Sequence, residues 1–318
     1  MNLFSNTWHL NCAFALSSGL LAFPAVSYSQ ALAHKVGKVH AEQVEIGYET
    51  FGESGTALPM LVVNGGPGLS HAYLLPTDVW KQLAQKRRVI FYDQRGTGAS
   101  KPLAPGAPQT MDAQIADLEA VRKGLGLTKF ILVGDSYGGL LSIAYASAHP
   151  DHIAKLVLSD AAGSNLNDIV HLFDQVFPDA MEKEKQEEKQ HTVMTQEVAD
   201  ETMRNHFKLI FYSPEQRDLY FKKLGPIRTL GFDVAVSEAV TKDASQMDYT
   251  PKLAGFKFPT LVITGRYDMN VAPLTAWRLK QGIPGAQLVF FEKSSHFPWF
   301  EEPAKYRTVV EQFLDGPN

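Results

Sequence analysis

The chain has 318 residues, enough for one large domain or two modest ones, which excludes a small scaffold held together by disulfides. Hydrophobic residues make up 45% of it and charged residues 20%, so the composition is that of a globular protein rather than a disordered chain or a coiled coil. The net charge of −4, from 30 basic and 34 acidic side chains, argues against the broad positive surface that nucleic-acid binding requires. The single cysteine, Cys12, cannot form an intramolecular disulfide or a zinc site, and neither a metal nor an organic cofactor is expected.

The first 33 residues differ from the rest of the chain. Residues 12–25, CAFALSSGLLAFPA, are apolar or small, and this run is too short to span a bilayer, so no stable membrane partner is expected. Followed by the triplet Ala31, Leu32 and Ala33, it is typical of a secretory signal with its cleavage site. We therefore predict a signal peptide over residues 1–33 and export to the periplasm or the medium. The alternatives are an uncleaved N-terminal anchor or a mis-assigned start in a cytoplasmic protein.

After this leader, short β-branched runs alternate with longer helical patterns. The expected strands begin at VEIGYETFG near residue 44 and continue at 61–64, 88–93, 130–135, 155–160, 260–265 and 287–292. Helical patterns cover residues 111–125, 137–149 and 303–314. The apolar residues of several strands are nearly continuous, which is typical of strands buried on both faces of a parallel sheet. We predict an α/β protein with a mostly parallel central sheet and helices on both of its faces.

About 100 residues separate the strands at 155–160 and 260–265, which is too long for a loop. This stretch contains the charge run EKEKQEEKQ at 182–190, expected to be a solvated helix face, and then an amphipathic helical pattern through residues 197–224. We predict a helical cap domain over residues 163–249, called the insertion below. Residues 34–162 and 250–318 then form the two parts of the core.

The segment GDSYGG, residues 134–139, lies directly between a predicted strand and a predicted helix. A serine on such a turn needs a strained backbone and small neighbours, as in the G-x-S-x-G motif, and becomes an exposed nucleophile. The helix that follows favours the negative charge that develops during acyl transfer. Ser136 is therefore a candidate nucleophile, with the Tyr137 N–H as an oxyanion donor. The simpler alternative is that Ser136 only caps a helix.

A serine nucleophile needs a base and an orienting carboxylate, and both follow downstream. Asp268 comes just after the strand TLVITG, and His296 comes just after the strand QLVFFE. Catalytic groups gather at the carboxyl ends of strands in open α/β sheets, and the order Ser, Asp, His is the one expected of a hydrolase of this class. We predict a catalytic triad of Ser136, Asp268 and His296.

The strand at 61–64 runs into the glycine-rich segment Gly65, Gly66, Pro67 and Gly68. Its backbone N–H groups can face Ser136, with Gly66 as the second oxyanion donor, or the segment can be a plain turn. The sequence also permits a cis Gly66-Pro67 bond.

Five segments together resemble the proline iminopeptidase (prolyl aminopeptidase) family of α/β-hydrolases: NGGPG at 64–68, YDQRGTGAS at 92–100, GDSYGG at 134–139, GRYD at 265–268 and SSHFPWFEEP at 294–303. The likeness covers most of the chain from Val44 onward, except the insertion. It implies the α/β-hydrolase fold and an enzyme that releases N-terminal proline, or another small apolar residue, from short peptides. Asp93 and Arg95 are expected to pair and brace the oxyanion loop, and Asn64 stands where the family usually has His.

A peptidase of this kind must neutralise the substrate's ammonium group with a carboxylate. Family members place an amine-binding Glu at about the position of Glu238, which makes Glu238 the candidate here; the alternative is that Glu238 is an exposed helix glutamate, and Glu201 and Glu215 are weaker candidates. Beside the catalytic Asp, where some members have a further carboxylate, this chain has Met269. The aromatic residues Tyr137, Phe297 and Trp299 can wall a pocket for the proline ring, or they can belong only to the core.

Two other functions remain open. The same triad would serve an esterase, amidase or lactonase acting on a small uncharged substrate, and the fold could also serve a binding protein without turnover. Serine at position 136 excludes the hydrolases of this fold that attack with a carboxylate. For a peptidase or an esterase the partner is a substrate, either a small molecule or a short peptide. The sequence makes no prediction of oligomeric state.

Overall fold

The computed structural model describes residues 32–53, 55–190, 195–226 and 230–316, and these belong to one compact unit that covers Leu32–Asn318. The leader predicted over residues 1–33 lies outside the described residues except for its last two positions. Among the described residues, no helix is both long and apolar enough to cross a membrane.

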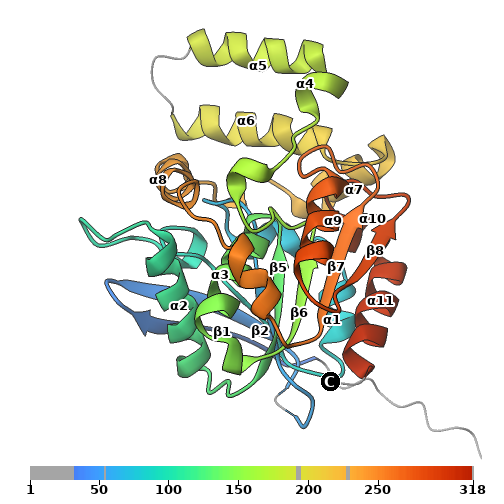
Figure 1. The fold of residues 1–318 in the computed structure, drawn as a ribbon. Coiled ribbons are helices and arrows are strands. Elements are labelled where there is room, and N and C mark those ends of the chain that lie inside the picture. The colour runs from blue at the N-terminus through green and yellow to red at the C-terminus, as the bar shows by residue number, and fades with distance from the viewer. Residues whose placement is uncertain (1–31, 54, 191–194, 227–229, 317–318) are drawn as a thin grey trace, which may run out of the picture. The chain divides into compact units, whose positions relative to one another are not determined.

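An eight-stranded sheet forms the centre of this unit, with the order β1-β2-β4-β3-β5-β6-β7-β8 (Figure 1). β2 pairs antiparallel with β1 and with β4, and the remaining neighbours pair in parallel. The strands are β1 (His34–Ala41), β2 (Val44–Phe51), β3 (Met60–Val63), β4 (Val89–Tyr92), β5 (Phe130–Asp135), β6 (Ile153–Ser159), β7 (Thr260–Gly265) and β8 (Gln287–Phe291).

Helices cover both faces of the sheet, as predicted (Figure 1). The core helices are α1 (Val79–Leu83), α2 (Met111–Gly124), α3 (Tyr137–Ala148), α9 (Pro273–Gly282), α10 (Pro298–Glu301) and α11 (Pro303–Asp315). Alternate residues of β5 show the two layers: Phe130 and Leu132 join the hydrophobic cluster of α2, α3 and α9, whereas Ile131 and Val133 join that of α1 and α11. Both faces of the parallel strands are therefore buried, which explains their continuous apolar runs.

β1 is the strand that sequence analysis missed. It is an edge strand whose residues are mostly exposed or half-buried, so its sequence HKVGKVHA lacks the apolar run that marks the inner strands. The pattern near residue 44 predicted only its partner β2, although the two pair along their full length, from His34 with Phe51 to Ala41 with Val44.

Between β6 and β7, the described residues form five α-helices: α4 (Phe173–Val176), α5 (Pro178–Gln190), α6 (Gln196–Leu209), α7 (Pro214–Leu224) and α8 (Val234–Ala244). Their apolar side chains are not a separate core. Phe207 and Tyr220 belong to the same hydrophobic cluster as the residues of β3 and β4. A backbone hydrogen bond from Asp233 N to Gly68 O, 2.9 Å long, further attaches the start of α8 to the glycine-rich segment after β3.

Candidate active site

Ser136 occupies the sharp turn between β5 and α3, with φ 55° and ψ −124°. This region of φ strongly favours glycine, so the backbone of Ser136 is strained. The turn also requires close approach of its neighbours: a Cβ on Gly138 would lie 2.2 Å from the Val63 carbonyl oxygen, and one on Gly134 would lie 2.5 Å from the Gly138 oxygen. The Ser136 carbonyl accepts hydrogen bonds from Gly139 N and Ala162 N, both at 2.9 Å. These contacts explain why small residues flank the serine.

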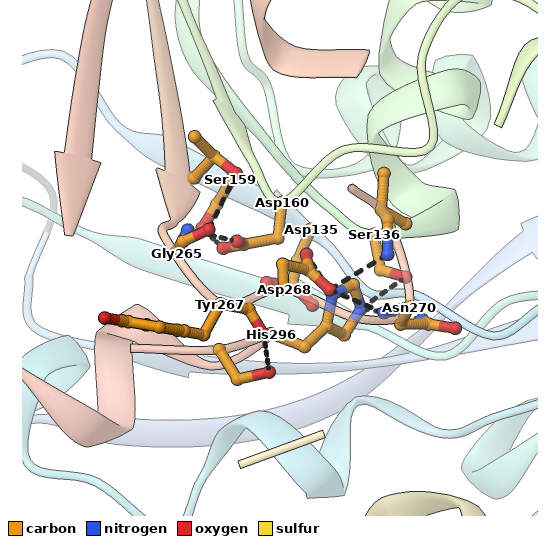
Figure 2. A network of polar contacts seen from close by, with 12 residues as sticks. Asp135, Ser136, Ser159, Asp160, Gly265, Tyr267, Asp268, Asn270 and His296 are labelled. Carbon is orange, nitrogen blue, oxygen red and sulfur yellow. Dashed lines mark hydrogen bonds and ion pairs between the residues drawn. The ribbon is translucent and has the colours of Figure 1, made fainter. Parts of the chain in front are cut away.

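The structure brings Ser136, His296 and Asp268 together, as the sequence predicts (Figure 2). Ser136 Oγ lies 3.0 Å from His296 Nε2, and His296 Nδ1 lies 2.7 Å from Asp268 Oδ2. Asp268 and His296 are buried, whereas Ser136 is partly exposed and lines a cavity. The second oxygen of Asp268 accepts hydrogen bonds from Asn270 N and Val271 N, both 2.9 Å long. The carboxylate is thus held in place for the imidazole.

Electrostatics favour the protonated form of His296. Burial by itself would lower the pKa of this imidazole, but the negative charges of Asp268 and Asp135 outweigh burial and raise the pKa above its ordinary value. With Nδ1–H donated to Asp268, the neutral imidazole leaves Nε2 free to accept the serine proton. The arrangement can therefore move a proton from Ser136 to His296 and stabilise the imidazolium ion that forms.

The two expected oxyanion donors belong to residues near Ser136. Gly66 lines the same cavity as Ser136 and has φ 123°, and its bond to Pro67 is cis. Tyr137 is the first residue of α3, where a backbone N–H has no acceptor within the helix. The Tyr137 ring, however, is buried beside Gln114 and Met111, with its hydroxyl 3.2 Å from Gln114 Nε2. The expectation that this ring walls the pocket is therefore wrong.

Asn64 and Asp93 contact the glycine-rich segment and the residues that follow it. Asn64 Nδ2 donates to the carbonyl oxygens of Gly65 and Leu69 at 2.9 and 2.8 Å, which closes the loop. Asp93 accepts from the backbone and the imidazole of His71, at 2.9 and 2.8 Å.

Arg95 does not pair with Asp93, contrary to the sequence-based expectation. Its guanidinium makes two 2.7 Å hydrogen bonds to the carboxylate of Asp117 on α2 and donates to the Pro108 carbonyl oxygen at 2.6 Å. Arg95 and Asp117 thus form a buried ion pair between the loop after β4 and α2, whereas Asp93 holds His71 in the segment that follows the oxyanion loop.

A cavity of about 110 Å³ opens in front of Ser136. An apolar cavity of about 150 Å³ accommodates a benzene ring, so this space suits a small acyl group. Its described lining residues are Gly66, Pro67, Leu69, Tyr73, Ser136, Met203, His206, Phe207, Ile210, Phe232, Ser237, Asn270, His296 and Phe297. Phe297 is thus a wall, as expected. Trp299 is not, because it is fully buried behind the cavity and donates from Nε1 to Asp135 Oδ1 at 3.0 Å.

The structure places the candidate amine-binding carboxylates away from this cavity. Glu238 lies on α8 with an exposed side chain, and only its neighbour Ser237 lines the cavity. Glu201 is exposed near Arg204 and Lys208, and Glu215 is exposed in the first turn of α7. Among the described lining residues there is no carboxylate, so the expectation of a buried Glu238 beside the substrate is wrong.

Sequence analysis missed the polar residues Tyr73, His206, Ser237 and Asn270 of the cavity, of which Asn270 and His206 lie near the catalytic imidazole. Asn270 Nδ2 lies 3.2 Å from His296 Nε2, the nitrogen that also faces Ser136 (Figure 2). His206, on α6, also lines the cavity; burial and the nearby His296 lower its pKa to about 4, so it is neutral at pH 7. Asn270 follows Asp268 by two residues and could have been found from that spacing, whereas no motif marks His206.

Asp160 is a third buried acid at this edge of the sheet. It follows β6 and accepts hydrogen bonds from Gly265 N at 2.8 Å and Ser159 Oγ at 3.2 Å (Figure 2). Burial and the charge of Asp268 raise its pKa. One side-chain atom each of Asp160, Asp268 and His296, of the kinds that bind metal ions, lie within 4.8 Å of one another. These three side chains already take part in the Asp268–His296 and Asp160–Gly265 hydrogen bonds.

Comparison with known proteins gives one consistent result. The family described as the alpha/beta hydrolase fold matches residues 59–303. A proline iminopeptidase of Saccharolobus solfataricus is 30% identical over 284 residues, 86% of this chain and 89% of the relative. Another from Lactobacillus helveticus is 30% identical over 291 residues, 85% of this chain and 95% of the relative.

Among solved structures, a thermophilic esterase from Thermogutta terrifontis superposes with a TM-score of 0.67 at 25% identity, covering 88% of this chain and 98% of the esterase. The eight-stranded, mostly parallel sheet agrees with this family match, which covers more than half of the chain. The chain therefore belongs to the α/β-hydrolase fold family, as a hydrolase related to the proline iminopeptidases.

Proposed function

We propose that the protein is a serine hydrolase that transfers a small acyl group first to Ser136 and then to water. The observation that carries this proposal is the continuous hydrogen-bonded series from Ser136 Oγ through His296 to Asp268, with lengths of 3.0 and 2.7 Å. Such a series activates a hydroxyl that is otherwise a poor nucleophile.

In the first half of the reaction, His296 Nε2 takes the proton of Ser136 as Oγ bonds to the substrate carbonyl carbon. The oxyanion that forms is stabilised by the N–H groups of Gly66 and Tyr137. The imidazolium, held by Asp268, then gives its proton to the leaving amine or alcohol as the bond to the acyl group breaks. In the second half, His296 Nε2 accepts a proton from water as the water oxygen bonds to the acyl carbon. The ester bond to Ser136 then breaks, the imidazolium returns its proton to Ser136 Oγ, and the carboxylic acid leaves.

Two substrate classes are supported by different observations. The relatives at 30% identity are proline iminopeptidases, which favours release of N-terminal proline from short peptides. The cavity favours a small uncharged ester or amide, because its described lining includes no carboxylate and a substrate ammonium there would lack a counter-charge. The esterase at 25% identity agrees with the second class. On the geometry of the cavity we place the uncharged substrate first.

A fluorophosphonate probe and three kinds of substrate test this proposal. Wild-type protein should be labelled at Ser136, and Ser136→Ala should lose labelling and turnover together, which a binding protein without turnover would not show. Turnover of p-nitrophenyl acetate and N-acetylproline esters at least ten times faster than that of proline-β-naphthylamide supports the uncharged substrate. The reverse preference identifies an aminopeptidase.

We also propose that the protein is exported. The predicted cleavage after Ala33 would leave His34, the first residue of β1, as the new N-terminus, so the β1–β2 pairing would stay complete. The intact mass of protein recovered from its native host should correspond to a chain that begins at His34. A mass that includes Met1 would overturn this proposal.

A further inference from the structure

Glu301, the last residue of α10, is a buried acid that the catalytic steps above do not use. Its two carboxylate oxygens accept hydrogen bonds from two different parts of the fold. Oε2 accepts from Ser295 N at 2.8 Å, one residue before His296. Oε1 accepts from Tyr212 N at 2.6 Å, in the segment between α6 and α7 of the insertion. One carboxylate therefore bridges the His296 loop and the insertion.

A second contact joins the same two segments. His296 N donates to the Ile210 carbonyl oxygen at 3.2 Å. Ile210 directly follows α6 and lines the cavity, together with the α6 residues Met203, His206 and Phe207. The position of the His296 backbone is thus tied to the helix that forms one wall of the cavity.

We propose that Glu301 is a positioning residue for His296, which holds the His296 loop against the insertion so that the imidazole and the cavity wall keep a fixed relation. This inference rests on the proposed serine hydrolase function. Only an ionised carboxylate has two oxygens that can both accept from N–H donors without competition from its own proton. A glutamine in its place would turn an N–H₂ group toward one of the two backbone N–H groups.

The charge of Glu301 also acts on His296. Glu301 faces Asp268 and His296 and has Glu302 beside it in the chain, and His296 additionally faces Asp135 and His206. Burial raises the pKa of Glu301 to about 7, so the carboxylate is ionised above that pH. Its negative charge helps to raise the pKa of His296, and a neutral side chain there should lower that pKa.

The adjacent Glu302 provides a matched control. Its carboxylate accepts from Lys293 N at 2.9 Å and from Ser294 Oγ at 2.8 Å, on the same loop, and among the described residues it makes no hydrogen bond to the insertion. Glu301→Gln and Glu302→Gln therefore remove the same charge from neighbouring positions, and only the first removes the bridge to Tyr212.

The test is steady-state kinetics with p-nitrophenyl acetate from pH 5.5 to 9, per active site counted with a fluorophosphonate. Glu301→Gln should lower kcat at least tenfold and move the acid limb of kcat/KM to lower pH. Glu302→Gln should stay within about threefold of wild type with an unmoved acid limb. Glu301→Asp keeps the charge but is too short to reach both donors, so it should lower kcat without moving the acid limb.

If Glu301→Gln matches Glu302→Gln in kcat and in its acid limb, the proposal is overturned. If Glu301→Gln does not fold, Glu301→Asp decides: wild-type kcat in that variant would equally overturn the proposal, whereas a kcat loss with an unmoved acid limb supports it. Failure of the proposed function would look different, because Ser136→Ala would then retain turnover whatever the result at Glu301.

Discussion

Trp299 donates a hydrogen bond from its indole to Asp135, so the helix after His296 is joined to the residue directly before Ser136. The other oxygen of Asp135 accepts from the Tyr73 hydroxyl at 2.5 Å, and Tyr73 in turn accepts from Gly65 N at 2.6 Å. Burial raises the pKa of Asp135 to about 6. The nucleophile turn, the oxyanion loop and the His296 loop thus meet at one buried carboxylate.

Removing the indole donor should therefore destabilise the protein. We expect Trp299→Phe to lower the free energy of unfolding by about 2 to 4 kcal/mol at pH 7.5, from a lost hydrogen bond to a charged group together with lost packing. At pH 5 Asp135 is protonated, so the loss should be smaller. Urea denaturation at both pH values measures the difference, and an equal loss at both would show that the bond to Asp135 contributes nothing.

The strained backbone of Ser136 predicts an opposition between stability and activity. Ser136→Ala keeps the strain, whereas Ser136→Gly relieves it at a position where φ is 55°. Strain of this kind costs about 1 to 3 kcal/mol, and glycine adds up to about 1 kcal/mol of entropy to the unfolded chain. We expect the free energy of unfolding of the glycine variant to be about 1 kcal/mol higher than that of the alanine variant. Both variants should be inactive. A glycine variant less stable than the alanine variant would contradict the strain.

The bond between Asp268 and His296 fixes which nitrogen carries the proton. In Asp268→Asn the amide can donate to Nδ1, so the imidazole would carry its proton on Nε2 instead. Nε2 could then no longer accept the proton of Ser136. We expect kcat to fall by about 10³- to 10⁴-fold with an unchanged fold. Kinetics with the ester substrate and a circular dichroism spectrum test this, and a loss of less than tenfold would remove Asp268 from the triad.

His71 predicts how stability depends on pH on the alkaline side. Burial opposes its charge, but Asp93 and Glu49 outweigh burial and raise its pKa to about 9. The charged His71 therefore stabilises the folded protein by about 3 kcal/mol. This contribution is complete below about pH 6.5, the ordinary pKa of histidine, and is lost as the pH rises through about 9. Urea denaturation should show this decline.

The decline should disappear in His71→Gln, which lacks the titrating group. His40→Gln offers a control, since His40 contacts Glu45 at an exposed site where an ion pair contributes little. If His71→Gln loses stability at alkaline pH as wild type does, other groups cause the decline.

The sequence was most informative where a short segment carries its own geometry. The turn around Ser136 and the residues after β7 and β8 are local consequences of strand ends, so order along the chain was enough to predict their meeting. The contact of Glu301 with Tyr212 joins residues 89 apart in sequence, and no local pattern encodes it.

Glu238 shows a different failure, since the helical period was available. Val236, Val240 and Ala244 are buried on α8 at intervals of four, which puts residue 238 on the opposite face of the helix. The likeness to family members led to a residue at the right distance along the chain but on the wrong side of the helix.

The hydrogen bond from Ala162 N to the Ser136 carbonyl has a consequence for how such a protein can diverge. It fixes the last residue before the insertion to the nucleophile turn itself, so the chain leaves the core from an anchored point. Helices added, lost or exchanged beyond that point would remodel the walls of the cavity without releasing Ser136. Changes in the insertion can therefore alter substrate preference while the residues that break the substrate bond stay the same.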